Sequence, residues 1–146
     1  PTLAETLQTD LNAARKAQDK PLTLVLGMVI AEIKNKRIEL RRDPSDEEIV
    51  DVIRKGIKKR RESVAMYEQG GRAELAAKEQ EEMAVLERYL PPAVDPDEVR
   101  AAVQEAIAGG ATTMGAVMGK VMPRFKGRVE GSLINQLAKE ELAPKA

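Results

Sequence analysis

Basic side chains are the groups in this sequence whose types and spacing best suit binding chemistry. Near the C-terminus, Lys120, Arg124, Lys126 and Arg128 alternate with other residues around Gly127. Cations on a glycine-containing loop can follow a chain of phosphate groups, and loops often carry function. No run of acidic residues lies beside this set, which we call the loop cations. The alternative is an ordinary solvated loop, since such loops are also common in proteins that bind nothing.

A second basic cluster occupies six of the eight positions from 54 to 61. It consists of Arg54, Lys55, Lys58, Lys59, Arg60 and Arg61. One interpretation is a secondary basic face that binds phosphates, formed by Arg54, Lys55, Lys58, Lys59 and Arg61. The other is local ion pairing, because Asp51 lies four residues before Lys55 and segment 74–87 is rich in Glu. Lys58 likewise precedes Glu62 by four residues. We favour local pairing.

The sequence contains neither histidine nor cysteine. This excludes Ser-His-Asp and Cys-His catalytic sites and every metal site built from Cys or His. No phosphate-binding glycine motif occurs, and nothing specific supports a Ser–Lys arrangement. We therefore expect no catalytic residue, no metal and no cofactor.

The net charge and the aromatic content of the chain limit the classes of molecule that it is expected to bind. The 24 basic and 24 acidic residues cancel, so electrostatic binding must be local, and DNA is not an expected partner. Aromatic residues make up 2% of the chain, which argues against base stacking. Any contact with RNA is therefore expected to involve its backbone and shape.

Composition also suggests a location. The absence of cysteine leaves no disulfides, and we see no secretory signal peptide. The longest apolar run, residues 22–33, is too short to span a bilayer of ~30 Å. We expect a cytoplasmic protein that does not enter membranes.

Helical periodicity runs through the whole chain and predicts an all-α fold. The first helix is marked by Leu3, Leu7 and Leu11, and further helices are expected at 21–42, 45–69, 72–90, 96–108, 113–122 and 131–142. A strand over 22–30 is the weaker alternative, since no turn separates it from the helical continuation. The prolines at 91, 92 and 96 predict a boundary between an N-terminal helical bundle (1–92) and a small three-helix domain (93–146).

The segment 114–137 has the most distinctive pattern. Gly115 and Gly119 lie one helical turn apart, which predicts close approach of a neighbouring helix. Pro123 is expected to end that helix, and Ser132 to act as the N-cap of the next. The methionines at 114, 118 and 122 share a face; we interpret them as core residues rather than a docking groove.

This segment resembles the YqeY-like proteins and the tail of GatB, the B subunit of the tRNA-dependent amidotransferase. The residues that carry the resemblance are Met114–Gly115, Met118–Gly119, Met122–Pro123, Lys126–Gly127, Gly131–Ser132–Leu133 and Asn135. The N-terminal part is also similar to YqeY-like proteins, in segments 10–16, 58–63 and 86–91 and in the apolar helix ending near Glu32. The resemblance therefore extends over nearly the whole chain.

The resemblance implies an all-helical protein whose tail domain helps to hold tRNA. By similarity, the loop cations become candidate tRNA contacts, while Gly115, Gly119 and Gly131 become packing positions. The large catalytic domain of GatB has no room in 146 residues. We therefore expect a non-catalytic module that binds tRNA or a tRNA-handling complex. The alternatives are a protein-interaction adaptor and an accessory subunit of a carbon–nitrogen ligase that uses glutamine as the amide donor.

Overall fold

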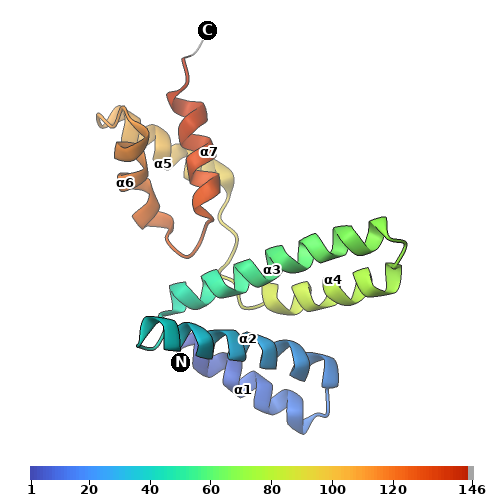
Figure 1. Cartoon of the computed structure of the whole chain (residues 1–146). Coiled ribbons are helices and arrows are strands. Elements are labelled where there is room, and N and C mark those ends of the chain that lie inside the picture. Colours follow the sequence, from blue (N-terminus) through green and yellow to red (C-terminus); the bar gives the residue numbers. More distant parts are fainter. Residues whose placement is uncertain (145–146) are drawn as a thin grey trace. The chain divides into compact units, whose positions relative to one another are not determined.

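The computed structural model describes residues 1–144 and contains seven helices and no strand in that range (Figure 1). The all-α prediction is confirmed, and residues 22–30 are helical. The chain forms two compact units, the first comprising residues 1–90 and the second starting at Pro91. None of the helices in the described range is long and apolar enough to cross a membrane.

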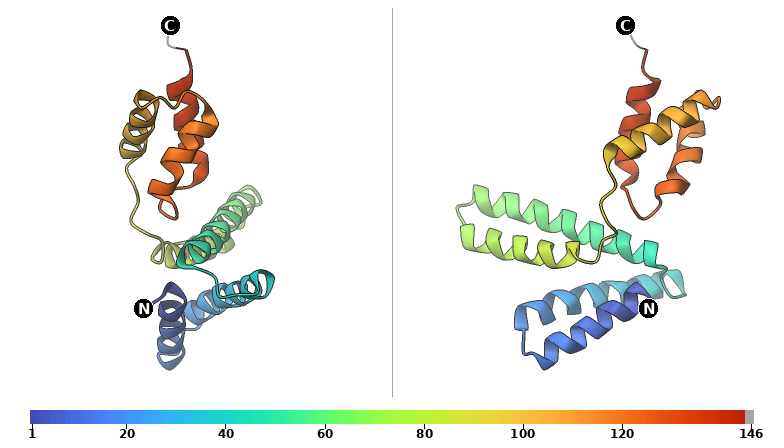
Figure 2. Two further views of the ribbon diagram at one scale, coloured as in Figure 1. Left: turned by 90° about the vertical axis from the view of Figure 1, so that its left-hand side faces the viewer. Right: turned by 180° about the vertical axis from the view of Figure 1, so that it is seen from behind.

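The first unit consists of two helical hairpins (Figures 1 and 2). Helices α1 (Leu3–Lys16) and α2 (Lys20–Leu40) form one, and α3 (Asp46–Gln69) and α4 (Ala73–Glu87) form the other. The hairpins meet through a core of aliphatic side chains. These are Leu7, Leu11, Val25, Leu26, Val29, Ile33, Ile49, Ile53, Ile57 and Leu86.

Side-chain caps begin the first three helices. The Thr2 hydroxyl and the Asp19 carboxylate accept hydrogen bonds from the backbone N–H groups of Glu5 and Leu22. Ser45 and Glu48 form the predicted capping box, in which each side chain accepts from the other's backbone N–H, at 3.2 and 3.0 Å. These contacts satisfy N–H groups that a helix start leaves unpaired.

The second unit contains α5 (Pro96–Ala108), α6 (Met114–Phe125) and α7 (Gly131–Leu142). All three helices contact one another around one core. Its buried residues are Val99, Ala102, Val103, Ala106, Ala111, Val117, Val121, Phe125, Ile134, Leu137 and Ala138. The single phenylalanine of the chain is 2% exposed here and is among its largest fully buried side chains.

The prediction that Pro123 ends its helix is wrong. Helix α6 continues through Pro123 to Phe125. The proline lies in the last turn, so it removes only one hydrogen bond near a helix end that would fray anyway. Two residues further on, burial of Phe125 contributes about 1.5–3 kcal/mol and requires the helix to reach that far.

Two further expectations about this unit fail. The N-cap of α7 is Glu130, and Ser132 lies inside the helix, where its hydroxyl donates to the Glu130 carboxylate at 3.4 Å. Within the described part of this unit, no atom of another element lies within 4 Å of a Cβ built on Gly115 or Gly119. Both glycines are exposed, because the core contacts of α6 come from Val117, Val121 and Phe125 on its other face.

One basic side chain of the first unit is buried. Arg60 on α3 is 7% exposed, and its Nε lies 3.4 Å from Glu82 Oε2 on α4. Its Nη1 also donates to the Gly56 carbonyl at 3.1 Å. A Cβ on Gly56 would stand 3.2 Å from Arg60 Nη1, so the glycine leaves room for the guanidinium. Arg60 therefore joins the two helices of the hairpin.

Glu48 should make the stability of the first unit depend on pH. Arg42 donates two hydrogen bonds to Glu48, at 2.6 and 3.1 Å, and together with the capping box it lowers the pKa of this carboxyl from 4.5 to about 2. A depressed folded-state pKa adds stability above the unfolded pKa, which is lost as the pH falls from about 4.5 to about 2. We expect Glu48→Gln, which can still accept the capping bond, to lose less free energy of unfolding across this window than the native chain. Chemical denaturation at several pH values measures this, and equal losses would contradict the assignment.

Arg60 and Arg61 provide a matched pair for testing the buried ion pair. Arg60→Ala leaves the Glu82 carboxylate, which is 13% exposed, without its partner, and should lower the free energy of unfolding by roughly 3 kcal/mol. Arg61 is exposed, so Arg61→Ala should change the free energy by less than about 0.5 kcal/mol. Urea denaturation of both variants tests the difference, and similar values would show that Arg60 has no structural role.

Candidate nucleic-acid interface

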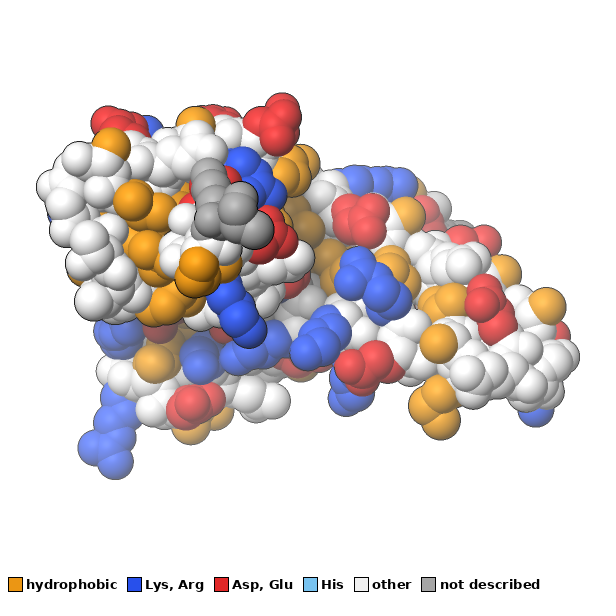
Figure 3. Space-filling model, turned by 90° about the horizontal axis from the view of Figure 1, so that it is seen from above, with side chains coloured by type: hydrophobic (Ala, Val, Ile, Leu, Met, Phe, Trp, Pro, Cys, Tyr) orange, Lys and Arg blue, Asp and Glu red, His pale blue; other side chains and the backbone are white. Residues whose placement is uncertain are grey.

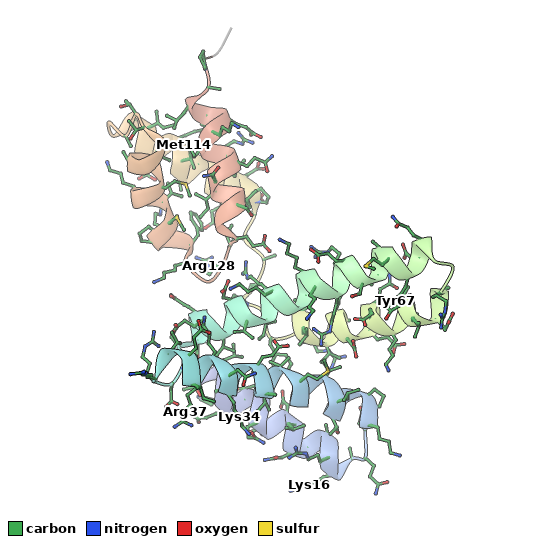
Figure 4. All side chains as sticks on the ribbon, in the orientation of Figure 1. Lys16, Lys34, Arg37, Tyr67, Met114 and Arg128 are labelled. Carbon is green, nitrogen blue, oxygen red and sulfur yellow. The ribbon has the colours of Figure 1, made fainter. Side chains whose placement is uncertain are left out.

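The loop cations lie at the C-terminal end of α6 and in the turn that follows. Lys120 and Arg124 belong to α6, Lys126 is its C-cap, and Arg128 lies in the turn before α7 (Figure 4). All four side chains are exposed. The expectation that all four lie on a loop is therefore wrong for Lys120 and Arg124, because α6 extends to Phe125. The four side chains nevertheless lie within one short segment that is open to solvent.

The backbone of this turn is well defined. Gly127 has a φ of +75°, a conformation that glycine adopts without strain. The N–H groups of Arg128 and Val129 donate to the Phe125 carbonyl at 2.9 and 3.1 Å. Because Phe125 is buried in the core, these bonds tie the turn to the packed part of the unit. Arg128 thus extends from a fixed backbone position.

The two cations on α6 lie close to α5. Arg124 Nη1 is 3.1 Å from Glu105 Oε2, and the Arg124 guanidinium lies 5.9 Å from the centre of the Phe125 ring. Lys120 Nζ is 3.7 Å from the position that a Cβ would take on Gly109, the C-cap of α5. The carbonyl groups at a helix C-terminus attract a cation. Sequence reasoning missed Glu105, because it lies 19 residues from Arg124 and only the packing of α5 on α6 brings them together.

The residues of the second basic cluster (54–61) differ in their exposure and in their ion pairs. Lys55 forms the predicted local ion pair, with its Nζ 3.2 Å from Asp51. Arg60 instead forms an ion pair across the hairpin, with Glu82 on α4. Arg54 is half-buried, whereas Lys58, Lys59 and Arg61 are exposed. Within the described first unit, none of these three has an acidic side chain within 4.0 Å, so the expected pairing of Lys58 with Glu62 is absent.

A groove of about 320 Å³ lies between the N-terminal half of α2 and α4. Its apolar wall includes Leu22, Val25 and Val85, and charged groups of both signs, among them Glu81 and Arg88, surround it. On α4, outside the groove lining, burial and the neighbouring Glu82 raise the pKa of Glu79. Among residues 1–144, no group of three acidic side chains is arranged to hold a metal ion. The groove offers no nucleophile and base pair, so we assign it no catalytic chemistry.

The methionine face of α6 is mostly part of the core. Met114, at the first turn of α6 in Figure 4, and Met118 are half-buried and pack against the second unit's core. Met122 is 42% exposed, and its Cε lies 3.5 Å from a Cβ position on Gly131. A single exposed methionine gives little support to a docking groove.

Comparison with known proteins identifies relatives along the whole chain. The family model described as Yqey-like protein matches residues 4–142. The chain is 30% identical to "Altered inheritance of mitochondria protein 41, mitochondrial" of Pyrenophora tritici-repentis, over 95% of its own length and 80% of that protein's. Proteins of the same name from Eremothecium gossypii and Saccharomyces cerevisiae (strain YJM789) are 35% and 33% identical over 58% of this chain. Those two matches cover 46% of the relatives' length.

These relatives also correct one expectation. All three are named as mitochondrial proteins, which contradicts the cytoplasmic location expected above. A lack of cysteine does not distinguish one reducing compartment from another, so composition was a poor guide to location. The family match, in contrast, extends from the first helix to the last, and by this match the chain belongs to the family of YqeY-like proteins.

Proposed function

We propose that this chain is a non-catalytic module that binds tRNA through the phosphate groups of its backbone, using the loop cations. The observation that carries this proposal is the exposure of all four cations within one segment whose turn is tied to buried Phe125. The backbone of this turn is already ordered, so binding has to order only the cationic side chains and not the turn itself.

The chemistry of this surface suits phosphate rather than bases. Lysine and arginine carry fixed charge, and the arginine guanidinium can donate two parallel hydrogen bonds to one phosphate. Phe125, the aromatic residue of this segment, is buried and cannot stack on a base. Recognition of the backbone and of overall shape is the mode that remains, as expected for a folded RNA.

The ion pair of Arg124 with Glu105 is compatible with this role. Both side chains are more than half exposed, and exposed pairs of this kind contribute only about 0–1 kcal/mol. A phosphate can therefore replace the Glu105 carboxylate at small cost. The resemblance of this segment to the GatB tail supports tRNA as the polyanion.

A salt series with bulk tRNA tests the proposal. If four phosphates are contacted, the logarithm of the affinity should fall with the logarithm of salt concentration at a slope of roughly −3.6, taking the duplex-DNA coefficient. Replacing Arg124, Lys126 and Arg128 together by Ala should reduce the slope by about three. Filter binding or fluorescence anisotropy between ~50 and ~200 mM salt gives both slopes, a range over which the native affinity should fall roughly a hundredfold.

The control removes three positive charges elsewhere in the chain. Arg15, Lys16 and Lys20 are exposed around the turn between α1 and α2, and their replacement by Ala should leave the slope unchanged. A slope near zero for the native chain, or equal slopes for the native chain and the loop variant, would contradict the proposal. Binding of a protein partner that survives high salt and is lost in Met122→Asp, which changes an exposed side chain on the same face of α6, would instead support the adaptor alternative.

A further inference from the structure

Helix α3 carries six basic and six acidic residues, and all six basic ones lie in segment 54–61. Lys58, Lys59 and Arg61 project from the exposed positions of α3, while the buried positions nearby are Ile57, Arg60 and Val64, which face the hairpin. Figure 3 shows Lys and Arg side chains on the visible face of the first unit, with acidic and hydrophobic side chains between them. We call Lys58, Lys59 and Arg61 the α3 basic face.

The acidic residues of α4 do not neutralise the α3 basic face. Glu82 pairs with the buried Arg60, Glu74 lies 3.3 Å from Arg72, and Glu81 lines the groove toward α2. On α3 itself, exposed Glu62 follows Lys58 by four residues and Lys59 by three, but forms no ion pair with either in the described first unit. Three cations and one carboxylate remain on this part of the surface, which leaves it locally positive. Arg60 pairs with Glu82 inside the hairpin, whereas Lys58, Lys59 and Arg61 are exposed to solvent.

We propose that the α3 basic face is a second phosphate-binding surface, whose ligand is the phosphodiester backbone of folded RNA. It lies in the first unit, so it is a separate site from the loop cations. Lys58 and Arg61 lie three positions apart and are neighbours on one side of α3, whereas Lys59 is rotated by about 100° from Lys58. The three long side chains therefore surround the exposed side of one helical turn. Such a cluster can contact neighbouring phosphates of one strand.

A membrane surface fits this face less well. Helices that lie on membranes insert an apolar face beside their basic one. The apolar stripe of α3 (Ile49, Ile53, Ile57 and Val64) is instead buried within the unit. Met66 is exposed on α3, but one methionine supplies little area for insertion. Phosphate contacts without insertion are what this surface can make.

The proposed function gives this second site a further consequence. If one tRNA reaches both surfaces, the second contact becomes intramolecular and strengthens the first without any new chemistry. A tRNA should then bind more tightly to the full chain than either surface alone would allow. This consequence rests on the proposed function, whereas the α3 basic face itself is testable separately.

The experiment compares tRNA binding across salt for four full-length proteins. These are the native chain, the α3 variant (Lys58, Lys59 and Arg61 to Ala), the loop variant (Arg124, Lys126 and Arg128 to Ala) and the variant that combines both. If this face adds three phosphate contacts to the four of the loop cations, the native slope should be roughly −6.3 instead of −3.6, and the α3 variant should be flatter than the native chain by about 2.7. Its affinity deficit relative to the native chain should therefore shrink about fortyfold between ~50 and ~200 mM salt.

Two controls separate charge from structure. The three residues are exposed and alanine favours helix, so circular dichroism and thermal unfolding of the α3 variant should match those of the native chain. A charge-conserving variant (Lys58→Arg, Lys59→Arg and Arg61→Lys) should retain the native slope. The Arg15/Lys16/Lys20 variant described above removes the same charge from the same unit and should behave as the native chain.

The outcomes distinguish this proposal from the previous one. A flattened slope in the α3 variant supports the α3 basic face, whatever the loop variant does. A native slope in the α3 variant overturns it, even if the loop variant loses binding and the proposed function holds. Binding to vesicles of phosphatidylcholine with ~30% phosphatidylglycerol that is lost in the α3 variant, with tRNA binding unchanged, would also overturn it in favour of an anionic membrane surface.

Discussion

Burial of one apolar stripe per helix is the constraint on which the rest of this structure depends. Each unit has its own core, built almost wholly from aliphatic side chains and from Phe125 in the second. Once those stripes are buried, all the remaining positions of each helix face solvent or a neighbouring helix. The same packing that stabilises the units therefore decides which cations are exposed, and it places the loop cations on the last turns of α6 and on the following turn, which is tied to the second core.

Arg60 shows how closely stability and surface charge are linked. Six of the eight residues from 54 to 61 are basic, and burying a charged side chain is costly. Only Arg60 of these six is buried, beside Gly56 and Glu82. The cost of burying that charge is offset by the ion pair and by the bond to the Gly56 carbonyl. The chain is thus neutral as a whole but strongly uneven locally, which a count of charges conceals.

Most of the fold could be predicted from the sequence, because its signals are local. Periodicity and caps such as the Ser45–Glu48 box located the helices to within a few residues. The predictions failed where contacts between residues far apart in the sequence determine where a helix ends or which of its faces is buried. Phe125 needs the core and carries α6 past Pro123, and Gly115 faces solvent because other residues of α6 make the packing contacts. The cations of the candidate site could be listed from the sequence. Glu105, which pairs with Arg124, could not be predicted, because only the packing of α5 on α6 brings the two residues together.

The central claim is that exposed cations on two defined surfaces, and not the rest of the molecule, contact RNA. The most direct test is a titration of the isotope-labelled full chain with tRNA, followed residue by residue in nuclear magnetic resonance spectra. The account predicts that amide signals change first around Lys120–Arg128 and along α3 at Lys58–Arg61, and that the changes reverse when salt is added. Changes confined to the groove between α2 and α4, or none at low salt, would contradict it.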